Sequence, residues 1–169
     1  MINAERLTVK AGEALTEAVT LARRSGNPTV YDVHLLAALL DQQESIVVPI
    51  IQKLGASVAA IREKVQREIA RYPKQTDAQP QVSRELNQVF DRAEDEAKKL
   101  GDEYVSTEHL LVALADVKGS ESKNLLNAAG VTRDPLLEAL EAVRGTHRVT
   151  DQNPENQYQA LEKYTRDLT

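Results

Sequence analysis

The sequence predicts an all-α fold made by tandem duplication of a four-helix repeat, with about eight helices related by a pseudo-two-fold axis. Two features of the composition indicate helices. The chain of 169 residues contains 21 Ala and 20 Leu, which favour helix, whereas aromatic residues make up only 4% and Trp is absent. A β-sandwich or barrel of this size would normally carry more aromatic and β-branched residues. The third feature, an internal repeat, determines the expected topology.

The repeat emerges when the sequence is compared with itself at an offset of 75 residues. Residues 7–69 then align with 82–144, with 13 identities in 63 ungapped pairs. The identities cluster in 34–41 and 109–116, which share the pattern His-Leu-Leu-x-Ala-Leu. A duplication of this kind predicts two similar units that pack against each other.

The first helix of each repeat is long and begins after a hydroxyl residue. Thr8 and Ser83 are the expected N-caps, because a side-chain oxygen there can accept a free backbone N–H of the first turn. Gly26 and Gly101 stand where a C-cap glycine is expected. Apolar residues recur at intervals of three and four and form one face: Ala11, Ala14, Leu15, Ala18 and Ala22 in the first repeat, and Leu86, Val89, Phe90, Ala93 and Ala97 in the second.

The second helix carries residues 34–41 or 109–116 and is apolar on nearly every side. This pattern predicts a buried helix that is surrounded by others. The expected cap is Asp32 in the first repeat and Ser106 or Thr107 in the second.

His34 and His109 open this helix at equivalent positions. A metal site is not expected, because each histidine is followed four residues later by alanine, where a second ligand would have to stand. We therefore expect both to be structural histidines. The sequence marks neither a Ser-His-Asp arrangement nor an acid–base pair, so no catalytic residue is predicted.

Two shorter helices complete each repeat. The third is expected at about 46–54 and 121–129, each followed by a glycine that can end it. The fourth is expected after Ser57 in the first repeat and after Thr132 in the second. Its apolar positions are Ile61, Val65 and Ile69 in the first repeat, and Leu136, Leu137, Leu140 and Val143 in the second.

The two repeats are expected to form one domain over residues 1–145. The connector 72–81 is polar and contains two prolines, which is typical of an exposed link. After Gly145 the helical pattern stops. Residues 146–169 are expected to be a linker, with a short helix at 157–167, that leads toward a module absent from this sequence.

Composition also limits the class of function. Acidic residues number 26 and basic residues 21, a net charge of −5, which argues against a nucleic-acid partner. No apolar run approaches the roughly 18 residues of a membrane span, and the N-terminus lacks the apolar stretch of a signal peptide. Without cysteine there can be no disulfide, thiol nucleophile or thiolate metal site. We therefore expect a cytoplasmic domain that has no membrane contact. We also expect it to be monomeric in isolation, because the two repeats can satisfy each other.

The doubled four-helix repeat resembles the N-terminal domain of the Clp family of AAA+ unfoldases. The residues that carry the resemblance are Leu7-Thr8, the two His-Leu-Leu-x-Ala-Leu segments, Leu54-Gly55 and Ala129-Gly130. Residues 160–169, Ala-Leu-Glu-Lys-Tyr-Thr-Arg-Asp-Leu-Thr, are similar to the segment that leads to the first ATPase module in the disaggregase branch, ClpB.

This resemblance implies a chaperone domain of the stress response. Such a domain engages unfolded or aggregated polypeptides and delivers them to the pore of its own hexameric AAA+ ring, which works with the DnaK system. The sequence contains no Gly-x-x-x-x-Gly-Lys-Ser/Thr phosphate loop. ATP and Mg²⁺ would therefore belong to the absent modules, and this chain is expected to be neither an enzyme nor a cofactor-binding domain.

The resemblance also names candidate substrate-binding residues: Thr8, Asp102 and Glu108. Thr8 offers a hydroxyl and free backbone N–H groups at a helix start. Asp102 and Glu108 are expected at the surface, where polar groups can orient a bound backbone. The structural alternative is that Thr8 only caps its helix and that Glu108 only complements the helix dipole.

Ser83 is the fourth candidate. The related ClpC branch reads phosphorylated arginine with a Thr or Ser at the first helix start and a Glu before the histidine of the second helix. Ser83 and Glu108 keep this pairing, whereas in the first repeat Val33 stands in place of the glutamate. That departure argues against phosphoarginine recognition, above all at the first site.

Other functions are left open by the sequence. One is an adaptor-docking or phosphoarginine-reading domain of a protease-partnered Clp ATPase. Another is a small helical enzyme, which would need a deep polar pocket with a perturbed pKa. For a groove that binds polypeptide, the apolar candidates are Leu7, Val9, Val105 and residues 46–48.

Overall fold

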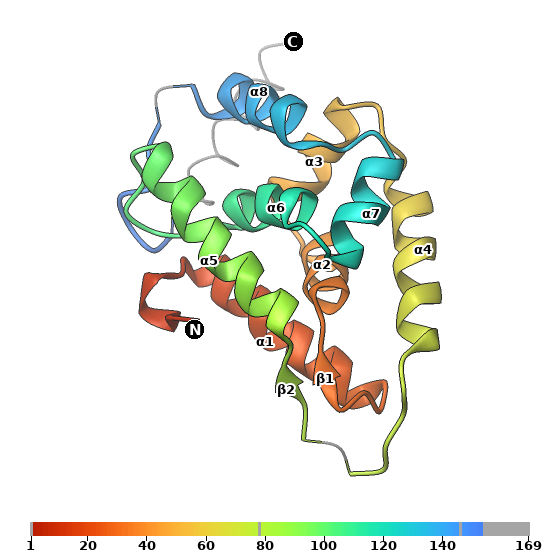
Figure 1. Cartoon of the computed structure of the whole chain (residues 1–169). Coiled ribbons are helices and arrows are strands. Elements are labelled where there is room, and N and C mark those ends of the chain that lie inside the picture. The colour runs from red at the N-terminus through yellow and green to blue at the C-terminus, as the bar shows by residue number, and fades with distance from the viewer. Residues whose placement is uncertain (1, 78, 146, 154–169) are drawn as a thin grey trace.

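A computed structural model describes residues 2–77, 79–145 and 147–153, and this part of the chain contains eight α-helices (Figure 1). The first copy of the repeat comprises α1 (Val9–Arg24), α2 (Asp32–Asp41), α3 (Val47–Lys53) and α4 (Val58–Arg71), preceded by a 3₁₀ turn, η1 (Ala4–Arg6). The second comprises α5 (Arg84–Lys99), α6 (Thr107–Asp116), α7 (Glu121–Ala128) and α8 (Arg133–Arg144). The predicted all-α duplication is confirmed.

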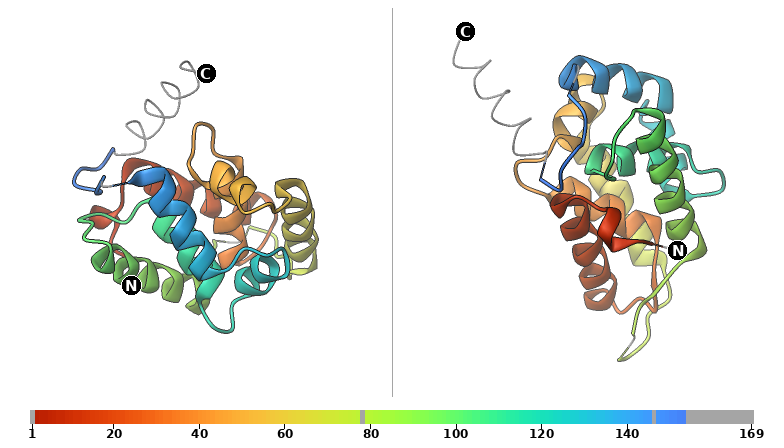
Figure 2. Two further views of the ribbon diagram at one scale, coloured as in Figure 1. Left: turned by 90° about the horizontal axis from the view of Figure 1, so that it is seen from above. Right: turned by 90° about the vertical axis from the view of Figure 1, so that its left-hand side faces the viewer.

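The second helix of each copy lies at the centre, as its apolar sequence predicts. Helix α1 packs on α2 and α5 packs on α6, while α2 and α6 contact each other and join the copies. Helix α8 lies across one end of the molecule, against α3 and α6 (Figures 1 and 2). No helix of the described residues is both long and apolar enough to cross a membrane.

The copies also exchange short strands, which the helical pattern did not predict. Strand β1 (Thr29–Val30) of the first copy pairs in parallel with β2 (Gln81–Val82), which precedes α5. The pseudo-symmetric counterpart is an isolated bridge between Leu7, before α1, and Val105, before α6. Elements of two residues are too short to show an alternating pattern, so sequence periodicity could not reveal them.

Through this exchange, the start of each long helix is hydrogen-bonded to the other copy of the repeat. The Thr8 N–H donates to the Val105 carbonyl at 2.9 Å, and the Ser83 N–H donates to the Val30 carbonyl at 3.0 Å. Both side chains are the predicted caps: Thr8 Oγ1 accepts the Ala11 N–H, and Ser83 Oγ accepts the equivalent N–H in α5.

The cap predicted at Asp32 is wrong. Tyr31 is the N-cap of α2, and its N–H donates to His34 Nδ1 at 2.8 Å. Asp32 is the first helical residue, and its carboxylate instead accepts the N–H of Ser122 in α7 at 2.7 Å. The histidine ring satisfies the helix start, which frees the aspartate to join the two copies.

The predicted connector 72–81 is only partly free of structure, because Gln81 belongs to β2. The helix predicted at 157–167 lies outside the described residues. Most of the predicted linker 146–169 does so too, and only 147–153 of it are described.

Candidate functional site

The start of α1 borders an apolar groove. A cavity of about 580 Å³ lies beside η1 and the first half of α1. We call it the α1 groove, and its lining is Ala4, Leu7, Gly12, Glu13, Leu15, Thr16 and Glu17. Val9, in the first turn of the same helix, is 49% exposed.

Gly12 leaves part of this groove open. It lies in the interior of α1, where glycine destabilises a helix by roughly 0.5–1 kcal/mol relative to alanine. A Cβ atom at this position would meet no atom within 4 Å, so packing within the chain does not require glycine. The absence of a side chain at this position leaves the surface of α1 open beside the groove.

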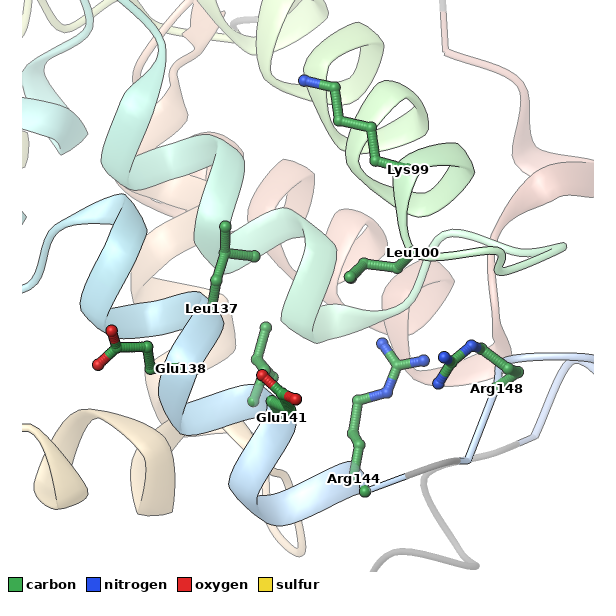
Figure 3. A pocket seen from close by; sticks show the side chains of 9 residues that line it. Lys99, Leu100, Leu137, Glu138, Glu141, Arg144 and Arg148 are labelled. Carbon is green, nitrogen blue, oxygen red and sulfur yellow. The ribbon is translucent and has the colours of Figure 1, made fainter.

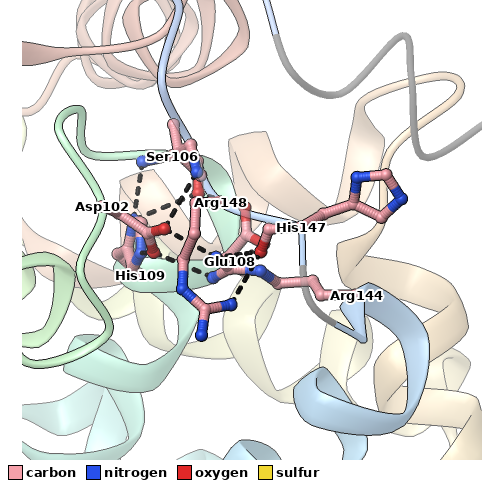
Figure 4. Close-up of polar contacts among 8 residues, drawn as sticks. Asp102, Ser106, Glu108, His109, Arg144, His147 and Arg148 are labelled. Atoms are coloured by element: carbon pink, nitrogen blue, oxygen red, sulfur yellow. Dashed lines mark hydrogen bonds and ion pairs between the residues drawn. The ribbon is translucent and has the colours of Figure 1, made fainter.

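Beyond the N-terminus of α1 lies a buried polar cluster that is centred on Asp102 (Figure 4). Arg144, at the end of α8, donates to both carboxylate oxygens of Asp102, at 2.6 and 2.9 Å. His109 Nε2 lies 2.7 Å from Asp102 Oδ2, and the Val149 N–H donates to Oδ1 at 2.9 Å. One carboxylate thus joins the end of α8, the start of α6 and the chain that follows α8.

The expected exposure of Asp102 and Glu108 is wrong. Asp102 is 5% exposed and Glu108 0%, and the Arg144 that pairs with them is 4% exposed. Glu108 accepts the Ser106 hydroxyl, and its second oxygen lies 3.6 Å from Arg144 Nη1. Arg144 provides the positive charge that allows the two carboxylates to be buried.

The pKa of Asp102 reflects this environment. Burial raises the pKa, but hydrogen bonds from His109 and Arg144 outweigh it and hold the value at about 2. Asp102 is therefore ionised at neutral pH, and its geometry makes it a positioning residue for the polypeptide around it.

The two histidines have equivalent structural roles, as expected. His34 Nδ1 and His109 Nδ1 each accept a backbone N–H at the start of their helix. The proton therefore lies on Nε2, which donates to Asn27 Oδ1 at 2.9 Å in the first copy and to Asp102 in the second. Burial lowers the pKa of His34 to about 4, so this ring is neutral at pH 7.

The copies differ in charge at three equivalent positions around the histidine. At an offset of 75, Asn27 aligns with Asp102, Val33 with Glu108 and Ile69 with Arg144. The first copy is thus neutral where the second carries two buried acids and a buried base. The alignment of Arg144 with an apolar residue was the sequence signal that could have revealed its role.

Asp102 and Glu108 share Arg144 as a partner, and Thr8 is bonded to the segment between them. Thr8 contacts Val105, in the same short segment as Asp102 and Glu108. Ser83 lies at the equivalent start of α5, against Val30 of the first copy. The exchange between copies therefore places Ser83 beside the turn that precedes α2, whereas Glu108 lies at the start of α6.

Most of the apolar residues proposed for the groove are core residues. Leu7 and Val105 are buried where they pair across the copies, and Ile46 and Val47 are buried at the start of α3. Leu7 still reaches the groove lining, and Val9 is exposed as expected.

A second cavity, of about 370 Å³, lies between the end of α5 and α8 (Figure 3). Its wall carries charges of both signs, including Lys99, Glu141 and Arg148. Asp102 and His34, whose pKa values are perturbed, line neither this cavity nor the α1 groove. Among residues 2–77, 79–145 and 147–153, no cluster of three His, Asp or Glu side chains forms a candidate metal site.

The duplicated helices with their exchanged starts define a Clp-type N-terminal repeat domain. The chain belongs to the Clp repeat (R) N-terminal domain family, whose match covers residues 6–129. The chain is thus a Clp N-terminal repeat domain, as the resemblance implied.

Within this family, the chain is similar to the chaperone protein ClpB. It is 44% identical over 164 residues to ClpB of Mycobacterium tuberculosis and 42% identical over 165 residues to ClpB of Corynebacterium glutamicum. Each match covers 96% of this chain and 19% of the relative, so the chain spans about a fifth of the length of these relatives.

Solved structures share the fold. The Hsp104 N-terminal domain of Candida albicans matches with a TM-score of 0.75 at 22% identity, over 88% of this chain and 98% of that domain. The N-terminal domain of the ClpV1 ATPase of E. coli matches with a TM-score of 0.72 at 21% identity, over 90% and 92%.

Proposed function

We propose that this domain recognises unfolded or aggregated polypeptides for a ClpB-like, ATP-dependent disaggregase. The observation that carries the proposal is the α1 groove, an apolar surface that Gly12 leaves open beside the exposed Val9. An unfolded chain exposes apolar side chains that a folded protein hides, and an apolar groove selects for them. The similarity to ClpB supports the assignment to a disaggregase.

The rim of the groove suits a polypeptide ligand. Glu13, Thr16 and Glu17 line it together with the apolar residues, so polar groups border the apolar surface. Such groups can bond the backbone of a bound segment while its apolar side chains enter the groove. A relative of the same fold, the ClpV N-domain of 24% identity, has been solved in complex with a VipB peptide, which supports a peptide-binding role.

The remaining partners follow from the ClpB-like assignment. Clients would pass to the pore of a cytoplasmic hexamer formed by the protein's own AAA+ modules, which would bind ATP and Mg²⁺ and act with the DnaK system. The alternative of phosphoarginine reading is disfavoured by geometry. It would require Glu108 to meet a client guanidinium, yet Glu108 is buried and faces Arg144.

Gly12 provides the test. Gly12→Leu should fill the α1 groove and weaken binding of α-casein, a natively unfolded polypeptide, by at least about 10-fold in titrations followed by NMR amide shifts. Gly12→Ala is the matched control: it should stabilise α1 by roughly 0.5–1 kcal/mol and change affinity by less than about 2-fold. Unchanged casein binding by Gly12→Leu, or shifts that avoid α1, would refute the proposed site.

A further inference from the structure

The segment that follows α8 is bound to the body of the domain. His147–Gln152, which we call the strap, runs past the turn between α5 and α6 to the start of α1 (Figures 1 and 2). Val149 is completely buried. Its N–H donates to Asp102, and its carbonyl accepts the Glu103 N–H at 2.7 Å.

The far end of the strap occupies the helix start that borders the groove. The Gln152 carbonyl accepts the Val9 N–H at 2.7 Å, and the Gln152 side chain reaches the Glu5 carbonyl at 3.3 Å. The Val9 N–H belongs to the first turn of α1, whose donors have no partner inside the helix. The strap therefore supplies an acceptor that a bound polypeptide could equally supply.

In the first copy, the segment that follows α4 is the counterpart of the strap, and it is covalently continuous with the next helix. After α4, the Pro73 carbonyl accepts Asn27 Nδ2, and the Gln75 N–H donates to the Gly26 carbonyl at 2.8 Å. That segment then continues along the chain into β2 and α5. The strap likewise leads from the last helix of its copy to the start of a first helix, α1, where hydrogen bonds and the burial of Val149 attach it.

We infer that the strap and a client polypeptide compete for the start of α1, an inference that rests on the proposed function. A competing client would be an extended segment that places a small β-branched side chain in the Val149 site. Its carbonyls three residues apart would replace those of Val149 and Gln152. Release of the six strap residues would add up to about 20 Å of free chain between the domain and the residues that follow Gln152. Binding of a client would therefore let the domain move farther from those residues.

A reversible lock tests the competition. The chain contains no cysteine, and the Gln152 side chain lies 3.3 Å from the Glu5 carbonyl, with both residues exposed. Glu5→Cys/Gln152→Cys therefore places two thiols at neighbouring surface positions, and loss of free thiol on oxidation verifies the disulfide. The oxidised form should bind α-casein at least about 10-fold more weakly than the form reduced with dithiothreitol. Each single cysteine variant is a control and should bind alike under both conditions.

The converse variant releases the strap. Val149→Asp places a carboxylate at a side chain that is completely buried, and Val143→Asp is the matched control at a valine that is 41% exposed. Only Val149→Asp should accelerate amide exchange at Val9 and Glu103 by at least about 10-fold and tighten casein binding by about 3-fold or more. If Val149→Asp does not fold, the lock at the two exposed positions decides alone.

The outcomes separate the two proposals. Equal casein binding by the oxidised and reduced double-cysteine forms would overturn the competition alone. Absence of casein binding in every form, reduced and oxidised, would overturn the proposed function and the competition with it.

Discussion

Replacing Asp102 with asparagine should destabilise the domain by about 3 kcal/mol at pH 7. Arg144 would lose its bidentate carboxylate partner while only 4% exposed, and removal of one partner from a buried ion pair typically costs about 3–5 kcal/mol. Glu108, at 3.6 Å, compensates part of that loss. The lowered pKa agrees in direction: a drop from 3.8 to about 2 corresponds to roughly 2 kcal/mol in favour of the ionised form.

The first copy of the repeat supplies the design for a rescue. Asp102→Asn with Arg144→Ile reproduces the pair Asn27 and Ile69, and Glu108→Val removes the acid that would remain without a partner. The triple variant should be at least about 2 kcal/mol more stable than the sum of the three single changes predicts, because the residues share one network.

Urea unfolding followed by far-UV circular dichroism gives each free energy. Since the pKa of Asp102 is lowered on folding, its stabilising contribution is complete above about pH 4 and is lost as the pH falls toward 2. Asp102→Asn should lack this loss. Strict additivity of the three single changes, or a loss below about 1 kcal/mol for Asp102→Asn, would refute the reasoning.

Three further predictions concern the helix starts. Because folding lowers the pKa of His34 from 6.5 to about 4, urea titrations should show stability that is complete above pH 6.5 and falls by up to about 3 kcal/mol as the pH drops to 4, with a flatter profile for His34→Gln. Asp32→Asn should change stability by less than about 1 kcal/mol, whereas Asp32→Ala, which leaves the Ser122 N–H unpaired, should cost about 1–3 kcal/mol by the same assay. Thr8→Ala and Ser83→Ala should each cost about 1 kcal/mol as lost caps. Only Thr8→Ala, beside the α1 groove, should also alter casein affinity, and equal effects on affinity would contradict a client role for Thr8.

Local signals in the sequence were sufficient for the helices. Alanine and leucine spacing gave the faces of α1 and α5, and the hydroxyl caps Thr8 and Ser83 gave their starts, because a cap bonds an N–H only three residues away. The offset of 75 residues gave the duplication. These features depend on neighbours within a turn or two, which a sequence displays directly.

The buried cluster could not be predicted in the same way. Asp102 and Glu108 follow a turn and open a helix, positions at which acids are usually solvated, and the residue that allows their burial is Arg144, far along the chain. The α1 groove could not be predicted from the sequence either. The sequence places Gly12 inside a helix but does not show that the space beside it is open.

The two copies differ in charge around the histidine, and this difference matches the segments that Asn27 and Asp102 bind. In the first copy Asn27 bonds a connector that is covalently continuous with the next helix, so a neutral amide is sufficient. In the second copy the strap has no covalent continuation into α1, and Asp102 bonds the Val149 N–H with an ionised carboxylate, which makes a stronger hydrogen bond. Arg144 holds that carboxylate in place and also donates to the His147 carbonyl at 3.0 Å. Asp102→Asn should therefore loosen the strap as well as destabilise the fold, and amide exchange at Val9 distinguishes the first effect from the second.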